Sequence, residues 1–259
     1  MQRLGVSGIG IRSVEARRCG AEHGRVISAL TARGLALVDD LPTREDLLLL
    51  ARSIATVVPH RDSDLDGVTT LIDLGEPTPR TGLAGFSAAE LAPHTDCSNS
   101  ATPPALLMMS CSTSAVSGGQ AVLVDGQAVH DDLAESAPDA LHAFTGPRSA
   151  LFGGASGHLG SILTGVRRER LLLRLRQDEL ARFSPEVAWH LPVLRAAIER
   201  HAIEIELAAG QGYLLDNHRW LHGRKTFTGH RVVHRIHGNP LPELGIVTGL
   251  RRPAPSGAA

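Results

Sequence analysis

Residues 213–237 read YLLDNHRWLHGRKTFTGHRVVHRIH, and this stretch decides the fold class. Two of its segments, Tyr213 to Asp216 and Arg231 to His237, look like β-strands. Similar runs precede them at Thr69 to Leu74, Ala105 to Cys111, Gln120 to Asp125, Glu169 to Arg174 and Ile203 to Leu207. Many short strands joined by loops favour a mostly β fold, a β-sandwich or jelly roll with flanking helices, over a parallel βαβ array.

Helices are predicted mainly in the N-terminal part of the chain. Residues 22–33 form an approximate apolar face that ends at Gly34, a short strand follows at Leu35 to Asp39, and Thr43 can cap a helix over Arg44 to Val57. A further helix is expected at Pro192 to Ala202. We expect a single domain over residues 1–259, with an N-terminal helical and strand support at 1–60, a jelly-roll core at 69–240 and a loose tail at 251–259.

The composition disfavours several kinds of partner. The 259 residues carry 26 basic and 27 acidic side chains, so the strongly positive field of a nucleic-acid binder or a polybasic membrane anchor is missing. Cys19, Cys97 and Cys111 are odd in number and far apart, and the N-terminus lacks the pattern of a signal peptide. No apolar run approaches the ~20 residues that span a bilayer. These features predict a soluble, cytoplasmic protein with a small-molecule partner, and they leave its oligomeric state open.

The first candidate for chemistry is His94-Thr95-Asp96, at the start of a predicted extended stretch. Alternate side chains of a strand share a face, so His94 and Asp96 should project into one cavity while Thr95 points away. A surface His beside a solvated Asp would produce the same pattern, which arises often by chance. The pair therefore needs a third residue before it predicts a metal site.

That residue is expected within residues 213–224, where a predicted strand ends among polar side chains. The segment is rich in His, and His222 is the candidate ligand. A facial-triad iron site needs two neutral imidazoles and one carboxylate on one face of the metal, with the opposite positions open for a cosubstrate and oxygen. His94, Asp96 and His222 could supply these groups. The alternative is a solvated loop whose His and Arg side chains face water.

Two arginines follow His222 in the strand-like run that ends the stretch. Arg231 and Arg235 are separated by an even number of positions, so both guanidinium groups should lie on one strand face. Such groups could bind carboxylates in bidentate fashion, which a Lys does less well. They could instead lie on the solvent face of an amphipathic strand, or Arg235 could form a buried pair with an acidic residue. Their position just after a candidate ligand favours anion binding.

The whole pattern resembles the iron(II) and 2-oxoglutarate dependent oxygenases of the taurine dioxygenase and clavaminate synthase superfamily. The matching pieces occur in order between residues 90 and 237: His94-Thr95-Asp96, Pro103-Pro104-Ala-Leu-Leu, Ser117-Gly-Gly, Asp216-Asn217, His222-Gly-Arg224 and Arg231-x-x-x-Arg235. Each piece is modest by itself. The H-x-D pair, a lone His far downstream and an Arg shortly after it are specific in combination.

The resemblance implies a double-stranded β-helix, a jelly-roll variant, and an Fe(II)/2-oxoglutarate-dependent dioxygenase that uses O2 and acts as a hydroxylase. It implies iron ligation by His94, Asp96 and His222. It also implies that Arg231 pairs with the distal carboxylate of 2-oxoglutarate and that Arg235 meets an anionic substrate group. Halogenating members of the family lack the carboxylate ligand, so the presence of Asp96 favours hydroxylation.

The sequence departs from the family pattern in one place. Relatives often carry a Thr shortly after the Gly pair that also bonds the cosubstrate, whereas here Gly118-Gly119-Gln120 leads to Ala121. Either Gln120 or another donor replaces this Thr, or the cosubstrate is held more weakly.

The substrate is predicted only as a class, a small and carboxylate-bearing molecule such as an amino acid or a biosynthetic intermediate. Asn99 is a candidate substrate contact, although capping a turn would explain it equally well. The loops His60 to Leu91 and Phe152 to Gly160 are expected around the mouth of the site, the second as a lid or a plain turn. Rival functions are a zinc-dependent hydrolase with the same ligands and a non-catalytic jelly-roll binding protein.

Overall fold

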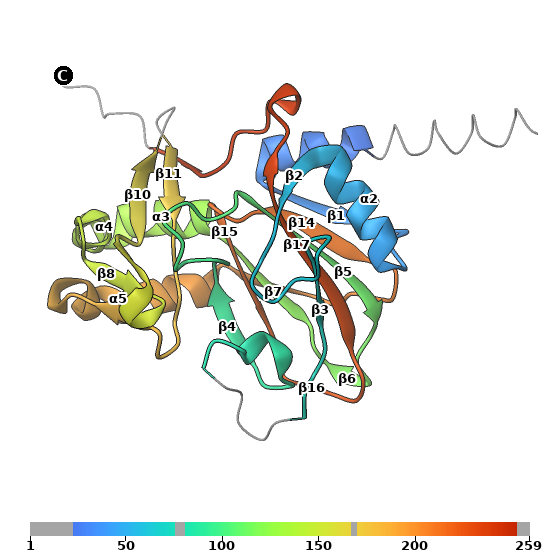
Figure 1. Ribbon diagram of the computed structural model, residues 1–259. Coiled ribbons are helices and arrows are strands. Elements are labelled where there is room, and N and C mark those ends of the chain that lie inside the picture. The colour runs from blue at the N-terminus through green and yellow to red at the C-terminus, as the bar shows by residue number, and fades with distance from the viewer. Residues whose placement is uncertain (1–22, 76–80, 167–169, 253–259) are drawn as a thin grey trace, which may run out of the picture.

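The computed structural model describes residues 23–75, 81–166 and 170–252, and its centre is a pair of antiparallel β-sheets (Figure 1). The larger, six-stranded sheet has the order β1-β14-β5-β17-β2, with β3 also paired to β17, and the four-stranded sheet has the order β13-β7-β15-β4. The larger sheet contains β1 (Leu35–Val38), β2 (Ala55–Val58), β3 (Val68–Leu71), β5 (Leu106–Thr113), β14 (Gly212–Asp216) and β17 (Val232–Pro240). The smaller sheet contains β4 (Leu91–His94), β7 (Ala121–Asp125), β13 (Ala202–Ile205) and β15 (Trp220–Arg224). The predicted mostly β fold with flanking helices is confirmed.

Alternating side chains of β5 show how one strand serves both faces of its sheet. Leu107 and Met109 pack with Leu123 of β7 in the apolar cluster between the two sheets. Leu106 and Met108 lie in a second cluster on the opposite face. All of these side chains are buried, and burying such a side chain contributes ~1.5–3 kcal/mol relative to leaving it exposed. The inner cluster holds the two sheets together around the site described below.

The helix α2 (Arg44–Ile54) covers the outer face of the larger sheet (Figure 1). Thr43 caps it as predicted: the Thr43 hydroxyl accepts from the backbone N–H of Asp46, and the Asp46 carboxylate accepts from the backbone N–H of Thr43. The predicted end at Val57 is wrong, because the helix ends at Ile54 and residues 55–58 form β2. These residues are mostly β-branched, and pairing with residues 237–240 of β17 satisfies their backbone groups.

Further helices cover the outer face of the four-stranded sheet. They are α3 (Gly126–Ser136), α4 (Pro138–Thr145) and α5 (Pro185–Arg200), and they pack in one cluster with Val124 of β7 and Leu221 of β15 (Figure 1). The sequence pattern predicts neither α3 nor α4. It also starts α5 too late, since Ser184 caps the helix through the backbone N–H of Val187 and places Pro192 inside it.

The other described elements are short. They are β6 (Ser117–Gly118), β8 (Ala150–Phe152), β9 (His158–Gly160), β10 (Leu163–Val166), β11 (Arg170–Leu173), β12 (Ala181–Phe183), β16 (Phe227–Thr228), β18 (Leu250–Arg251) and the single-turn helices η1 (Ala84–Phe86), η2 (Gly154–Ser156) and η3 (Pro242–Leu244). The glycine-rich stretch between β8 and β9 is a turn of an antiparallel hairpin. None of the described helices is long and apolar enough to cross a bilayer.

Two predictions concern the ends of the chain. Residues 23–33 are helical, and the helix stops at Gly34, whose φ of +68° suits a glycine. Arg251 belongs to β18, which corrects its assignment to a loose tail, because its strand pairs with β11. Residues 253–259, Cys19 and Glu169 lie outside the described residues.

Candidate metal centre and active-site cavity

The candidate metal-binding side chains come from neighbouring strands of the four-stranded sheet. His94 ends β4, His222 lies in β15, and the two are register partners. Asp96 lies two residues past the end of β4. Gly223 permits the close approach of the two strands, because a Cβ at this position would lie 2.5 Å from the carbonyl oxygen of Leu91. The sheet therefore brings together residues that are far apart in the sequence.

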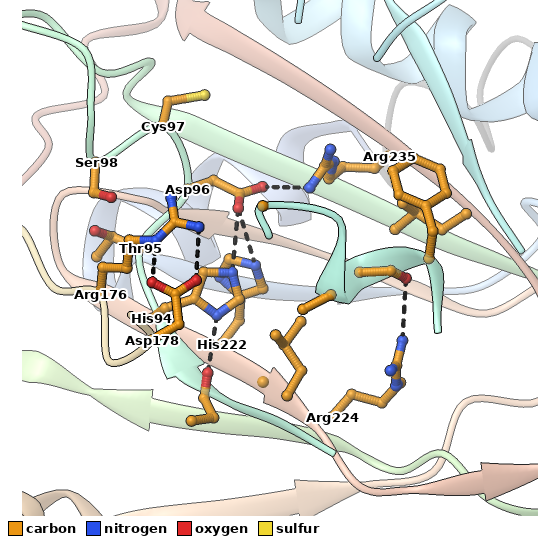
Figure 2. A pocket seen from close by; sticks show the side chains of 18 of the residues that line it. His94, Thr95, Asp96, Cys97, Ser98, Arg176, Asp178, His222, Arg224 and Arg235 are labelled. Carbon is orange, nitrogen blue, oxygen red and sulfur yellow. Dashed lines mark hydrogen bonds and ion pairs between the residues drawn. The ribbon is translucent and has the colours of Figure 1, made fainter. Parts of the chain in front are cut away.

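His94, Asp96 and His222 form a cluster of potential metal donors (Figure 2). One donor atom from each side chain lies within 4.8 Å of the others. Asp96 Oδ1 is 3.3 Å from His94 Nε2 and 3.7 Å from His222 Nε2. Within the described part of the chain, no other group of His, Cys, Asp or Glu residues converges in this way. Two imidazole nitrogens and one carboxylate oxygen are the donor set that a facial-triad iron site needs.

Both imidazoles are available in the neutral form that binds a metal. His94 Nδ1 lies 3.0 Å from the carbonyl oxygen of Ala92, and a proton donated there leaves Nε2 as the free lone pair. Burial, together with the neighbouring His94, lowers the pKa of His222 from 6.5 to about 3. His222 Nδ1 is buried and has no hydrogen-bond partner among the described residues. A neutral imidazole is the form that binds a metal, so the cluster fits a divalent ion such as Fe(II).

The second carboxylate oxygen of Asp96 is held from the opposite sheet. Arg235 Nη1 lies 3.0 Å from Asp96 Oδ2, and His237 Nε2 lies 2.8 Å from the same oxygen. Figure 2 shows Arg235 and the two imidazoles reaching different oxygens of the Asp96 carboxylate. Burial raises the pKa of Asp96, but Arg235, His222 and His237 outweigh this effect and hold the pKa well below its usual value. Asp96 is therefore an ionised carboxylate.

The backbone of Asp96 is fixed by Asn217. The side-chain oxygen of Asn217 accepts from the backbone N–H of Asp96 at 2.8 Å, and its amide nitrogen donates to the carbonyl oxygens of Asp96 at 3.1 Å and Pro104 at 2.9 Å. The sequence places Asn217 in the family pattern without a role, and it gives His237 none. The even spacing of His237 from Arg235 is the signal that could have placed it on the same strand face.

A cavity of about 390 Å³ opens beside the cluster, and Arg231 lines it. Arg231 is only 8% exposed, and its guanidinium group lies 5.5 Å from the centre of the Phe227 ring. No carboxylate or carbonyl oxygen of the described residues accepts a hydrogen bond from it, and burial lowers its pKa. A buried guanidinium group without a protein anion is suited to an anionic ligand.

The other arginine and asparagine candidates have different surroundings. Arg224 donates to backbone carbonyl oxygens of Gly85, Ser87 and Ala89, so it holds this segment against the cavity. Arg235 lines the cavity but pairs with Asp96, which is the buried acidic pairing that the sequence left open. Asn99 is exposed and also lines the cavity. Contacts of Arg235 and Asn99 with a substrate stay predictions.

Two ion pairs line the cavity besides these residues. Arg176 Nη2 donates to Asp178 Oδ2 at 2.7 Å, and Figure 2 shows this pair next to the His–Asp–His cluster. Arg61 Nε donates to Asp62 Oδ1 at 3.1 Å within the predicted mouth loop. The sequence pattern singles out neither pair, because nothing local distinguishes them from solvated charges. The cavity wall therefore offers both signs of charge.

The fold and the site together define a class of protein. Antiparallel sheets around a His–Asp–His cluster and a buried arginine are typical of non-haem iron enzymes that use an anionic cosubstrate and oxygen. Residues 2–237 match the model of the taurine catabolism dioxygenase TauD, TfdA family, and the chain belongs to this family. The predicted enzyme class, an Fe(II)/2-oxoglutarate-dependent dioxygenase, is confirmed, and Fe(II), 2-oxoglutarate and O2 are the cofactor and cosubstrates of the family.

Several solved structures share the fold. The structure of asparagine oxygenase superimposes with a TM-score of 0.68 at 16% identity, covering 92% of this chain and 85% of that chain. The non-heme iron oxygenase OrfP, in complex with Fe, succinate and (3R,4R)-dihydroxy-L-Arg, has a TM-score of 0.64 at 14% identity, covering 87% and 81% of the two chains. The PvcB protein from Pseudomonas aeruginosa has a TM-score of 0.62 at 18% identity, covering 83% and 79%. No curated protein matches the sequence.

Proposed function

We propose that this protein is an Fe(II) and 2-oxoglutarate dependent hydroxylase of a small, carboxylate-bearing molecule, an amino acid or a biosynthetic intermediate. The observation that carries the proposal is the cluster of His94, Asp96 and His222 beside a cavity that a buried Arg231 also lines. The cluster provides a place for the metal, and the arginine provides a place for an anionic cosubstrate.

His94, Asp96 and His222 are the proposed iron ligands. Iron bound there would supply the redox chemistry that couples 2-oxoglutarate and O2 to substrate oxidation. The contribution of the chain is to present two neutral nitrogens and one ionised carboxylate at the cavity wall, where they would hold the metal within reach of the cavity. The carboxylate of Asp96 supports hydroxylation over halogenation.

Arg231 is the proposed partner of the distal carboxylate of 2-oxoglutarate, and Tyr213 is the proposed substitute for the Thr missing at Ala121. Tyr213 lines the cavity and is 2% exposed, and its hydroxyl donates to Met109 Sδ at 3.0 Å. A thioether is a weak acceptor, so the hydroxyl can turn to a carboxylate oxygen at little cost. Gln120, the other candidate, is not among the described residues that line the cavity.

An amino acid is the favoured substrate. Another asparagine oxygenase structure is a complex with Fe(II), 2S,3S-3-hydroxyasparagine and succinate, and OrfP structures contain hydroxylated L-Arg. The pairs Arg176–Asp178 and Arg61–Asp62 support a substrate with a carboxylate and an ammonium group, because each sign of charge finds a partner in the wall. Asn99 is the proposed hydrogen-bonding contact. Arg235 lines the cavity and is the proposed contact for a substrate carboxylate in addition to its pair with Asp96.

We further infer that the two sheets form a double-stranded β-helix within a single oxygenase domain, with the jelly-roll core at residues 69–240. The order in which the chain visits the sheets supports this topology: β4, β7, β13 and β15 lie in one sheet, whereas in the other sheet β5 comes between β4 and β7, β14 comes between β13 and β15, and β17 follows β15. Cys97 and Cys111 are free thiols, which supports the proposed cytoplasmic location.

The deciding experiment is anaerobic addition of Fe(II) and then 2-oxoglutarate to the metal-free protein. We expect the weak visible charge-transfer band of this family to appear only when both are present and to be lost in His222→Ala. Oxygen uptake and succinate formation with a panel of amino acids would then identify the substrate. Hydrolytic turnover with Zn(II) and without 2-oxoglutarate would favour the zinc hydrolase, and ligand binding without any turnover would favour the binding protein.

A further inference from the structure

We propose that His237 and Arg235 are positioning residues that restrict Asp96 to one-oxygen metal ligation and thereby keep the cavity side of the metal open. This inference rests on the proposed iron ligation by Asp96. Both residues belong to β17 of the six-stranded sheet, whereas His94 and His222 belong to the four-stranded sheet. The carboxylate is thus the one member of the cluster that is held by both sheets.

The two oxygens of Asp96 face different groups. Oδ1 lies 3.3 Å from His94 Nε2 and 3.7 Å from His222 Nε2, where a shared metal ion would sit. Oδ2 accepts hydrogen bonds from His237 Nε2 at 2.8 Å and from Arg235 Nη1 at 3.0 Å. Oδ1 is therefore available to the metal, whereas Oδ2 is bound by protein donors.

This division matters because a carboxylate can bind a metal through one oxygen or through both. A facial triad works by leaving the opposite positions open for cosubstrate and oxygen. If Asp96 turned its second oxygen to the metal, it would take one of those positions. Both hydrogen bonds to Oδ2, one of them from a guanidinium group, would first have to break.

The donors are fixed well enough for this role. His237 is 1% exposed, and its backbone pairs with Val58 on one side and Leu107 on the other. Its ring also lies beside that of His60, with 5.3 Å between the ring centroids. The side chain of Asp96 is 9% exposed, so water has little access to replace a lost donor.

Arg235 and His237 act in different ways on the same oxygen. Arg235 adds a positive charge, and its Coulomb attraction to the carboxylate depends on distance more than on orientation. The imidazole N–H of His237 adds a directed donor at a fixed point of a rigid strand. His237 is therefore the residue whose loss should change the orientation of the carboxylate, while Arg235 would still neutralise it.

The test uses Co(II) as the probe, followed by 2-oxoglutarate, with no turnover required. His237→Phe keeps a ring but removes the donor, and His237→Gln keeps an N–H donor. His234→Phe is the matched control, because His234 is a buried His of the same strand whose ring bonds Thr70 Oγ1 at 3.3 Å and not Asp96. Co(II) affinity, the visible Co(II) spectrum and 2-oxoglutarate affinity of the Co(II) protein are measured for each.

We expect His237→Phe to bind Co(II) ~10–100-fold more weakly, with a changed spectrum and weaker 2-oxoglutarate binding. His237→Gln should recover most of both affinities, and His234→Phe should match the parent protein. Parent-like affinities and spectrum in His237→Phe would overturn the inference and leave iron ligation intact. An equal loss in His234→Phe would also overturn it, since the effect would then belong to the strand as a whole.

Two further outcomes keep the test decisive. If the parent protein fails to bind Co(II), the proposed function fails and the inference fails with it. If thermal melting shows that His237→Phe does not fold, Arg235→Met decides instead, because it removes the other donor to Oδ2 from a side chain that is 11% exposed. An unchanged visible Co(II) spectrum in that variant would overturn the inference.

Discussion

Replacing Arg231 by Lys should weaken 2-oxoglutarate binding without changing the affinity for the metal. Arg231 is 8% exposed, and its guanidinium group donates no hydrogen bond to an acceptor among the described residues, so no protein group would compete with a bound carboxylate for its N–H donors. A hydrogen bond to a charged group contributes ~1.5–3 kcal/mol. A single ammonium can keep one of two such bonds, and losing the other corresponds to a ~10–150-fold higher Kd at ~1.4 kcal/mol per tenfold change.

The assay is calorimetric titration of 2-oxoglutarate into the Co(II)-loaded protein, with Co(II) affinity measured separately. Arg61→Lys is the matched control, because Arg61 lines the same cavity but its side chain is 60% exposed and paired with Asp62. We expect the control to change the 2-oxoglutarate Kd by less than about twofold, as exposed pairs contribute little. Parent-like 2-oxoglutarate affinity in Arg231→Lys would remove Arg231 from the cosubstrate site. Equal weakening in both variants would mean that only the net charge of the cavity matters.

Four further changes test other parts of the site. His222→Ala and Asp96→Ala should each abolish stoichiometric iron binding, and parent-like iron content with retained activity in both would contradict the triad. Gly223→Ala should lower the melting temperature by ~2–10 °C and weaken Co(II) binding, because its Cβ would lie 2.5 Å from the carbonyl oxygen of Leu91. A parent-like melting temperature and Co(II) affinity would refute the close approach of β4 and β15. Tyr213→Phe should raise the Kd for 2-oxoglutarate ~2–10-fold. An unchanged Kd in calorimetric titration would mean that Tyr213 does not replace the Thr of the family pattern. Burial, Arg235 and His237 lower the pKa of His60 from 6.5 to about 4. Between pH 6.5 and about pH 4 the unfolded chain therefore binds a proton at His60 that the folded chain does not bind, and the stability of the fold decreases as the pH falls through this range. Between about pH 7 and pH 5, the melting temperature of His60→Phe should therefore decrease less than that of the parent protein. An equal decrease would mean that other groups cause the acid sensitivity.

Features that depend on near neighbours in the chain could be predicted from the sequence. The cap at Thr43 and most strands follow from local propensity and alternation, since both require only a few adjacent residues. The same alternation predicted that His94 and Asp96 share one cavity, and both line it, but Thr95 lines it too, because β4 ends at His94 and Asp96 lies in a turn. Alternation fails where pairing across the sheet outweighs it, as at residues 55–58, where β2 replaces the expected end of a helix.

The sequence by itself determined which residue types stand at the site: an H-x-D pair, a later His and an arginine on a strand, together with a mostly β fold. Only the tertiary structure decided what each of them meets. Arg235 could have faced a substrate anion, solvent or an acid. It reaches Asp96 because β17 lies in the opposite sheet. Asn217 and His237 hold the same aspartate although they lie 121 and 141 residues after it in the sequence. Such contacts depend on which strand faces meet when two sheets pack, and no pattern within a single strand carries that information.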